Sequence, residues 1–324
     1  MTEKIENLWE KHISVLLNEL VNSINILESD NIIVDCTLWM AGHFIEVAKK
    51  LNPWDIIIWF DADLKNLWLA KQRITEELEN INFIEKKEDK NKDKLNIILI
   101  NSNFWNLKEE LEKIWIEKIT GIYYDLWLSS LHLDEADRWF SFMQNWPLDM
   151  RLDKSHWKTA AQIINSYLAS ELREVFLKYW ESLQANKLAH KIVDLRKQKK
   201  FETTSDLAEI IPGPPKEKAK IFQALRIEVN KELEMLEKSL KEAIELLEKD
   251  WIIFVISFHS LEDRTTKQIF KKETRDCICS DFICSCHHKK SLKLLNKKPI
   301  LPTQEEISQN SRSRSAKARI AQKI

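Results

Sequence analysis

Glycine is scarce in this sequence, with 3 residues in 324. Average usage of roughly 7% would place about 23 glycines in a chain of this length. A protein of mixed helices and strands normally needs glycine at turns and helix ends where the backbone angle φ is positive. Tryptophan is abundant instead, with 13 residues. Either the turns of this protein form without glycine, or some of the residues given as tryptophan in this sequence are not tryptophan in the natural protein.

A long hydrophobic run and a strong net charge are also lacking. No apolar stretch approaches the ~20 residues that span a bilayer, and the first residues lack the apolar core of a signal peptide. The 50 Lys and Arg residues against 51 Asp and Glu exclude a protein that is basic throughout, so contact with a polyanion needs a local patch. Five cysteines, an odd number in a long chain, favour a reducing compartment over a disulfide scaffold. We therefore expect a cytoplasmic protein with no membrane partner.

Apolar, β-branched runs alternate along the chain with amphipathic stretches. The runs predict strands at 32–36, 55–61, 96–100, 119–126 and 252–257. The stretches between them predict helices, for instance at 46–51, 65–80 and 107–118. Strands that alternate with helices indicate an α/β fold with a doubly wound, Rossmann-like parallel sheet.

The strand pattern is absent between Leu133 and Pro215, whereas the helical pattern continues. We predict helices at 160–180, 183–200 and 204–211, an exit at the proline-rich segment 212–215, and a long helix at 219–249 that leads into the last strand. The chain then ends in a basic Ser/Arg tail at 310–319. The predicted organisation is a sheet domain at 1–131, an all-helical insertion for substrate recognition at 132–216, and the second part of the sheet domain with its tail at 217–324.

Two of the predicted strands lead to residues typical of a nucleotide-type cofactor site. The first strand runs through a turn into Gly42 and His43, and Asp61 lies 19 positions after Gly42 at the end of the second strand. At this offset a dinucleotide fold places a carboxylate on ribose hydroxyls. The complete G-x-G-x-x-G pattern is absent, so the looser turn favours S-adenosylmethionine over NAD. The alternative is an ordinary strand–helix turn with an acidic strand end.

Two further strands also end in polar residues. Asp125, Ser129 and Ser130 follow the fourth predicted strand, and His259 follows the last. Because ligands of open α/β sheets bind outside the carboxyl ends of the strands, these residues belong to the site if the strands form. The alternative for His259 is a hydrogen-bonded loop histidine.

A cysteine cluster lies near the end of the chain. Cys277, Cys279, Cys284 and Cys286 are followed directly by two histidines. Structural zinc prefers pairs separated by two to four residues, and C-x-C is tight for one tetrahedral ion. We therefore expect no metal here, with the four thiols as the candidate ligands if one binds. The alternative is a reduced surface loop that is prone to oxidation.

Motifs along nearly the whole chain resemble the MraW/RsmH family, the S-adenosylmethionine-dependent methyltransferases that modify cytidine N4 in small-subunit (16S) ribosomal RNA. The most specific match is 255–264, VISFHSLEDR. The other matching segments are 12–17, 35–38, 42–43, 61–63, 125–126, 128–130, 133–138, 140–142, 147–153, 222–227, 229–230, 232–233 and 312–317. The resemblance implies a class I methyltransferase fold, S-adenosylmethionine as cofactor, and small-subunit rRNA or the 30S particle as partner, with no DNA.

The resemblance also implies roles for particular residues. Ala41, Gly42 and His43 would form the turn against the methionine part of the cofactor, Asp61 would bind the ribose and Phe104 the adenine, and Asp125 and His132 would complete the pocket. Asp125 is also the candidate acceptor that orients the target amine. The candidate RNA contacts are Arg138, Arg151, Lys154, His259, Arg264, Arg312, Arg314, Lys317 and Arg319. The alternative for the basic clusters is that they only confer solubility.

Two other functions stay open at this point. One keeps the cofactor and changes the substrate to DNA, protein or a small molecule. The other is a non-catalytic RNA-binding or assembly protein, which requires that tryptophans such as Trp39 and Trp127 are genuine and block the pocket.

The family pattern has glycine where this sequence has Trp39, Trp59, Trp127, Trp139, Trp146, Trp180 and Trp251. In some bacterial lineages UGA encodes glycine, whereas a common alternative translation table reads it as tryptophan. We hypothesise that these tryptophans are mistranslated glycines. Two milder departures are Ala41, which replaces a family glycine, and His132, which replaces the usual glutamine.

This hypothesis predicts UGA codons at the 13 tryptophan positions and a natural protein without tryptophan fluorescence. Sequencing the coding DNA and recording the emission of natively expressed protein check both statements. Strong tryptophan emission from that protein would show that the residues are genuine.

Overall fold

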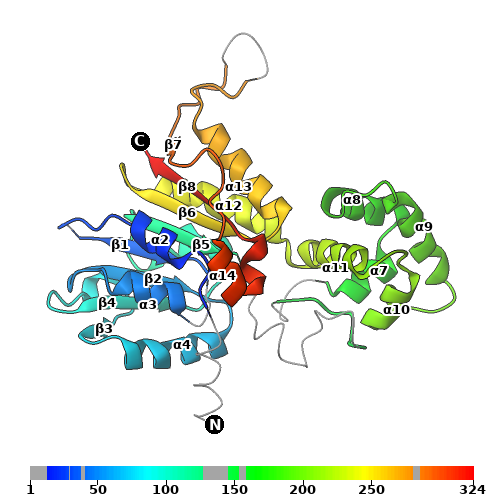
Figure 1. Ribbon diagram of the computed structural model, residues 1–324, viewed down its shortest axis with the longest axis horizontal. Coiled ribbons are helices and arrows are strands. Elements are labelled where there is room, and N and C mark those ends of the chain that lie inside the picture. Colours follow the sequence, from blue (N-terminus) through cyan, green and yellow to red (C-terminus); the bar gives the residue numbers. More distant parts are fainter. Residues whose placement is uncertain (1–12, 29, 38–40, 127–144, 153–157, 280–284) are drawn as a thin grey trace. The chain divides into compact units, whose positions relative to one another are not determined.

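The computed structural model of the protein describes residues 13–28, 30–37, 41–126, 145–152, 158–279 and 285–324. The chain divides into two units (Figure 1). The first joins Met1–Trp127 to Met235–Ile324, and the second is Leu128–Glu234. Among the described helices, none is both long enough and apolar enough to cross a membrane.

The first unit is built on one eight-stranded sheet. The order across it is β3-β4-β2-β1-β5-β6-β8-β7, and β8 runs antiparallel to both of its neighbours while the other pairings are parallel. The bounds are β1 (Ile32–Asp35), β2 (Ile56–Phe60), β3 (Ile81–Phe83), β4 (Leu95–Ile100), β5 (Gly121–Asp125), β6 (Ile252–Ser257), β7 (Leu292–Leu294) and β8 (Lys317–Lys323). The chain moves outward from β1 and then returns to its other side at β5, which confirms the predicted doubly wound sheet.

Helices cover both faces of this sheet. Their bounds are α2 (Leu17–Ser23), α3 (Gly42–Ala48), α4 (Leu64–Glu77), α5 (Leu107–Lys113), α12 (Glu232–Leu246), α13 (Ser260–Glu273) and α14 (Gln304–Gln309). Ile32 and Val34 of β1 pack into a core shared with α5, α12 and α13, whereas Ile33 packs into a core shared with α2, α3 and α4. The strands are therefore apolar at nearly every position, as expected for parallel strands that are buried on both faces.

The second unit contains the helical insertion. Its helices are α7 (Ala160–Ser166), α8 (Ala169–Tyr179), α9 (Ala185–Leu195), α10 (Thr204–Ile210) and α11 (Pro215–Asn230). The predicted helix at 160–180 is thus two helices. The unit also extends through Glu234, past the predicted exit, because α11 packs against α7 and α8.

Two other predictions differ from the structure. The long helix predicted at 219–249 is divided into α11 and α12 at Lys231, whose φ of 53° is left-handed. The basic tail is folded: it forms the short 3-10 helix η3 (Ser311–Ser315) and then β8, which pairs with β6. The hydrogen bonds of β8 to a buried strand explain its order, which composition could not indicate.

Two tryptophans have unfavourable surroundings for this residue type. Trp59 of β2 is fully buried and stacks on Phe44, and its indole Nε1 has no hydrogen-bond partner within the described part of the chain. A buried polar group without a partner costs about 1–3 kcal/mol. Trp115 has a φ of 65°, a region that favours glycine and is costly for a bulky residue. Both observations are compatible with the glycine hypothesis, which stays a prediction.

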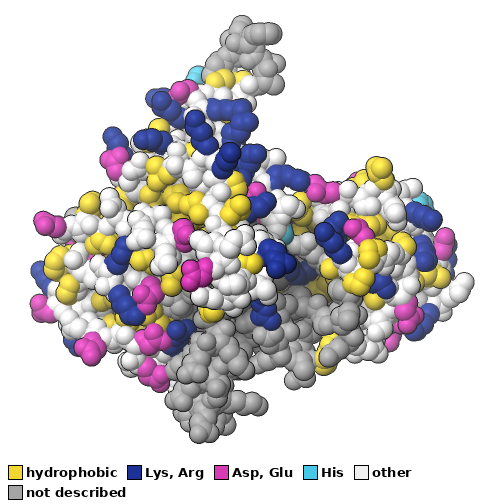
Figure 2. Space-filling model, viewed as in Figure 1, with side chains coloured by type: hydrophobic (Ala, Val, Ile, Leu, Met, Phe, Trp, Pro, Cys, Tyr) yellow, Lys and Arg dark blue, Asp and Glu magenta, His cyan; other side chains and the backbone are white. Residues whose placement is uncertain are grey.

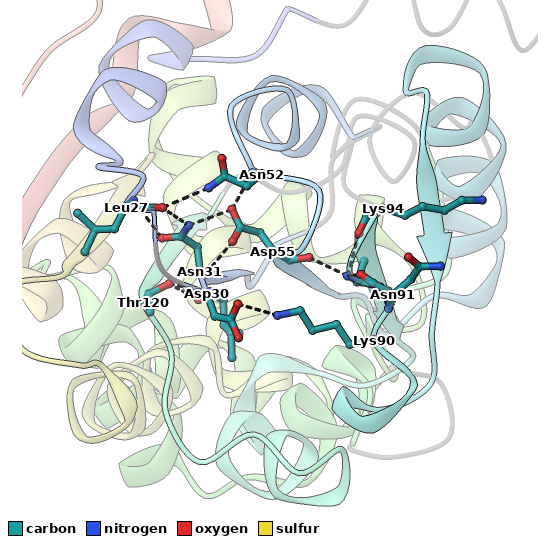
Figure 3. A network of polar contacts seen from close by, with 11 residues as sticks. Leu27, Asp30, Asn31, Asn52, Asp55, Lys90, Asn91, Lys94 and Thr120 are labelled. Atoms are coloured by element: carbon teal, nitrogen blue, oxygen red, sulfur yellow. Dashed lines mark hydrogen bonds and ion pairs between the residues drawn. The ribbon is translucent and has the colours of Figure 1, made fainter.

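A buried polar network ties the amino ends of the central strands together (Figure 3). The carboxylate of Asp55, which precedes β2, accepts hydrogen bonds from the backbone N–H and the side-chain amide of Asn31 (2.8 and 2.9 Å) and from the N–H of Asn52 (2.7 Å). The amide of Asn96 in β4 donates to the carbonyl of Asp55 (3.2 Å). At the rim, Asp30 pairs with Lys90 at 2.9 Å. The network fixes the relative register of β1, β2 and β4.

Replacing Asp55 should therefore destabilise the fold. Asp55→Ala leaves three donors without their acceptor, and we expect the free energy of unfolding in urea to fall by about 3 kcal/mol. The matched control Asp30→Ala breaks a solvent-exposed ion pair and should cost at most about 0.5–1 kcal/mol. Equal losses in the two variants would contradict the structural role of the network.

Candidate active site

The point where the strand order reverses lies between β1 and β5. Parallel register pairs Asp35 of β1 with Tyr123 of β5, so both strands present their carboxyl ends at one edge of the sheet. Asp125 ends β5, and Asp61 directly follows β2. Ligands of open α/β sheets bind outside this edge, at the switch point.

Asp35 and Asp125 are joined at this edge through Thr37. The backbone N–H of Asp125 donates to Thr37 Oγ1 at 2.5 Å, and the backbone N–H of Thr37 donates to Asp35 Oδ1 at 3.0 Å. Asp35 and Asp125 are both buried. Burial raises the pKa of Asp35 well above its usual value, and repulsion from Asp125 raises this pKa further. The two acidic groups are thus held close together in a place poor in water.

His43 is buried beside Asp125. His43 Nε2 lies 2.9 Å from the carbonyl oxygen of Val15, and Nδ1 lies 3.4 Å from Asp125 Oδ2. A carbonyl only accepts, so Nε2 carries the ring proton. Burial lowers the pKa of His43 to about 4, which leaves the ring neutral at pH 7. Nδ1 therefore has no proton to donate to Asp125, and the hydrogen bond to Val15 is the contact that orients the ring.

The N-terminal segment that supplies Val15 is itself anchored. The backbone N–H of Leu16 donates to Glu306 Oε1 of α14 at 2.6 Å, and the amide of Asn310 donates to the carbonyl of Ile13 at 3.2 Å. Segments from both ends of the described chain thus fix the position of His43.

Asp61 lies at the same edge in a different environment. Its Oδ1 accepts from the backbone N–H of Asp63 at 2.5 Å, and its Oδ2 lies 3.4 Å from the amide of Asn66. Burial raises the pKa of Asp61 to about 7, although both hydrogen bonds lower this pKa. A carboxylate at this position can accept hydrogen bonds from vicinal hydroxyls.

The remaining predicted cofactor residues flank these carboxylates. Ala41 has a φ of 61° and caps the start of α3, so it adopts the left-handed conformation for which the family uses glycine. Gly42 is the first residue of α3. Phe104 begins the 3-10 helix η2 (Phe104–Asn106) after β4 and packs edge-on against Tyr124, with 5.9 Å between the ring centroids.

Part of the predicted RNA-binding set lies at this edge as well. The antiparallel register pairs Lys317, at the start of β8, with Ser257, at the end of β6, so η3 with the exposed Arg312 and Arg314 precedes β8 at the carboxyl edge. Arg264 is exposed in the first turns of α13.

Arg319 is placed differently from its prediction. It is 8% exposed, and its Nε lies 2.6 Å from Asp263 Oδ1, so this guanidinium is part of the folded core. Lys317 Nζ lies 3.9 Å from the same carboxylate.

In the helical unit, the guanidinium of Arg151 forms a bidentate pair with the carboxylate of Asp149. The distances are 2.7 Å from Nε to Oδ1 and 3.0 Å from Nη2 to Oδ2.

His259 caps α13. Its Nδ1 accepts from the backbone N–H of Glu262 at 3.3 Å, and its Nε2 lies 2.9 Å from Glu262 Oε1. The carboxylate of Glu262 in turn accepts from the backbone N–H groups of Phe258 and His259. These contacts agree with the alternative given above for His259, a hydrogen-bonded loop histidine. The reciprocal cap explains why α13 begins directly after this residue.

Several predicted residues lie outside the described residues, namely His132, Arg138, Lys154, Cys284, Ser129 and Ser130. The structure adds Asp35, Thr37 and Val15 to the site. Asp35 could have been found from the sequence, because it ends an apolar strand as Asp61 and Asp125 do. The contact of Val15 joins residues far apart in the chain and left no local pattern.

The strand order, the helices on both faces and the acidic carboxyl edge define a Rossmann-like methyltransferase of class I. The sequence profile of the MraW methylase family matches residues 10–324. The chain belongs to this family.

Curated relatives agree over almost the whole chain. It is 42% identical to ribosomal RNA small subunit methyltransferase H of Clostridioides difficile strain 630, covering 97% of this chain and 99% of that protein. It is 41% identical to the proteins of the same name from Finegoldia magna and from Clostridium botulinum strain Loch Maree, with the same coverage in both cases.

Proposed function

We propose that this protein transfers a methyl group from S-adenosylmethionine to the exocyclic N4 of a cytidine in small-subunit ribosomal RNA. The observation that carries the proposal is the family match over residues 10–324 together with three carboxyl groups, Asp35, Asp61 and Asp125, at the switch-point edge. The near-complete coverage of relatives named small subunit methyltransferase H supports the rRNA substrate. A cytoplasmic location follows from this substrate.

The residues at the edge fit S-adenosylmethionine. The left-handed residue Ala41 and the start of α3 at Gly42 form the turn that we assign to the methionine part. Asp61 can accept both ribose hydroxyls, and the ring of Phe104 offers a surface for adenine. We assign His132 to the same pocket on the family resemblance. When bound, S-adenosylmethionine supplies a methyl group that its sulfonium has already activated.

The protein then has to orient a weak nucleophile and handle one proton. The N4 lone pair of cytosine is delocalised into the ring, so positioning supplies much of the catalysis. Asp125 can accept a hydrogen bond from the amine and stabilise the positive charge that develops there. The neutral ring of His43 packs beside the Asp125 carboxyl group. We therefore assign Asp125 as the catalytic residue and His43 to the turn against the methionine part of the cofactor.

The RNA has to present an extruded base at this edge. A cytidine reaches the methyl group only after leaving its stack, which favours an open or splayed segment. Arg264, Arg312, Arg314 and Lys317 lie where they can contact the flanking phosphates. We assign Arg138, Arg151 and Lys154 to RNA contacts from the helical insertion. Free rRNA and the assembled 30S particle are both possible partners.

The pKa of Asp61 predicts how cofactor affinity depends on pH. If the ionised carboxylate binds the ribose, the free protein must first lose a proton below pH about 7. The Kd for S-adenosylmethionine, measured by calorimetry, should then rise up to about tenfold for each pH unit below that value and stay flat above it.

The variant Asp61→Asn should flatten this pH profile of the Kd and weaken binding by about 10- to 100-fold. Asp63→Asn, a matched control that keeps the cap on α4, should retain the pH dependence. A flat profile in the unsubstituted protein contradicts the assignment.

The activity itself is tested by transfer of labelled methyl. We expect label in small-subunit rRNA or 30S particles, recovered as N4-methylcytidine after digestion, and none in DNA or protein. Asp125→Asn should lower kcat by about 10²–10⁴-fold and leave the Kd for S-adenosylmethionine within a few-fold. Asp30→Asn, at the amino edge, should change neither. A loss that lies wholly in cofactor affinity would show that Asp125 holds the cofactor, and label in another substrate would overturn the proposed function.

A further inference from the structure

An arm of chain leaves the sheet unit between α13 and β7 and carries four of the five cysteines, of which Cys277, Cys279 and Cys286 lie in the part of the chain that the structure describes. Its base is closed by two hydrogen bonds: the backbone N–H of Ser291 donates to the carbonyl of Glu273 at 2.8 Å, and Ser291 Oγ donates to Glu273 Oε2 at 2.7 Å. His288 Nε2 lies 3.3 Å from the carbonyl of Lys272 on the same base. The two sides of the arm are therefore held in a fixed pairing below the cysteines.

The sulfur atoms converge beyond this base. The Sγ atoms of Cys277, Cys279 and Cys286 all lie within 4.8 Å of one another, and those of Cys277 and Cys286 are 3.9 Å apart. Two thiolates on one tetrahedral ion, each with a bond of about 2.3 Å, are separated by about 3.8 Å. The observed spacing thus already approaches that of thiolates on a shared metal.

Backbone N–H groups point at each of the three sulfurs. The N–H of Cys279 lies 3.4 Å from Cys277 Sγ, that of Ser285 lies 3.4 Å from Cys279 Sγ, and that of Ile278 lies 3.5 Å from Cys286 Sγ. Hydrogen bonds to sulfur favour the thiolate and orient it, as outer-shell donors do in metal sites. Ile278, which separates Cys277 from Cys279, is 37% exposed.

We propose that Cys277, Cys279 and Cys286 bind one zinc ion as thiolates and that this ion closes the tip of the arm. The Cys277-x-Cys279 pair is tight for one ion by its spacing alone, but the structure already places both of these sulfurs within 4.8 Å of each other and of Cys286 Sγ. Each thiol loses its proton to solvent as the ion binds. Three soft ligands favour zinc over magnesium or calcium, which prefer oxygen.

The ion has a structural role in this proposal. Exposed cations lie on the arm at Lys289 and Lys290 and beside its base at Lys271 and Lys272 of α13 and Lys293 of β7. Figure 2 shows Lys and Arg side chains gathered over the region of α13 and β7. Repulsion among these like charges opposes a compact arm, and bonds from one ion to both of its sides oppose that repulsion.

The test is the metal content of the full-length protein. After incubation with zinc sulfate and gel filtration, elemental analysis should find one zinc per chain. Cobalt in place of zinc should give thiolate charge-transfer bands and the intense visible bands of tetrahedral cobalt. Cys277→Ser, Cys279→Ser and Cys286→Ser should each lose most of the metal and the bands. Cys36→Ala removes a buried thiol of the sheet unit and should retain both.

A second measurement keeps the proposal testable if a variant fails to fold. In the unsubstituted protein, zinc should protect Cys277, Cys279 and Cys286 from alkylation, as read by mass spectrometry, and a chelator should remove this protection. Substoichiometric zinc in the unsubstituted protein, or alkylation that zinc does not change, would overturn the proposal. Neither readout involves methyl transfer, so the proposed function stands or falls separately.

Discussion

The pairing of β1 with β5 is the interaction on which the site depends. It places Asp35 and Asp125 at neighbouring strand ends, where two buried acidic groups oppose each other's ionisation. Such an arrangement is stable only if other groups hold the carboxyl groups in place. Thr37 links the two strand ends by hydrogen bonds to both residues, and the buried ring of His43 packs beside Asp125. The hydrogen bonds of Thr37 thus hold the two acidic residues in place.

The two ends of the central strands use acidic residues in opposite ways. At the amino edge, Asp55 has its oxygens occupied by protein donors, and the result is a fixed register of three strands. At the carboxyl edge, Asp61 has fewer donors and a raised pKa, which leaves it able to bind a ligand. Asp55 is fully buried and its carboxylate accepts three protein hydrogen bonds, whereas Asp61 is partly exposed and its carboxylate accepts two. Exposure and the number of protein hydrogen bonds together distinguish the two roles.

The central fold could be predicted from the sequence because its strands are apolar at nearly every position. The five predicted strands all form, and the acidic residues that end them mark the correct edge. The edge strand β8 could not be predicted, since its residues, Lys-Ala-Arg-Ile-Ala-Gln-Lys, look like part of a basic tail until they pair with β6. The break between α11 and α12 was missed for a similar reason: Lys231 carries no signal for a left-handed turn, and the packing of α11 on α7 and α8 imposes it.

The sequence predicted which residues lie at the carboxyl edge better than it predicted their contacts. Asp61, Asp125 and Phe104 lie where the strand ends put them, whereas the burial of Arg319 against Asp263 depends on a contact between distant segments. His43 was expected in the turn against the cofactor, and its ring is buried beside Val15 and Asp125. Local sequence identifies which residues reach an edge. It does not identify which of them are then occupied by the protein itself.

The most direct test is a crystal structure of the protein with S-adenosylhomocysteine, the product left after methyl transfer. The account predicts that the nucleoside lies at the carboxyl edge between β2 and β5, with a ribose hydroxyl within hydrogen-bond distance of Asp61. A ligand bound at any other part of the sheet, or a site that tryptophan side chains fill and that takes up no ligand, would contradict it.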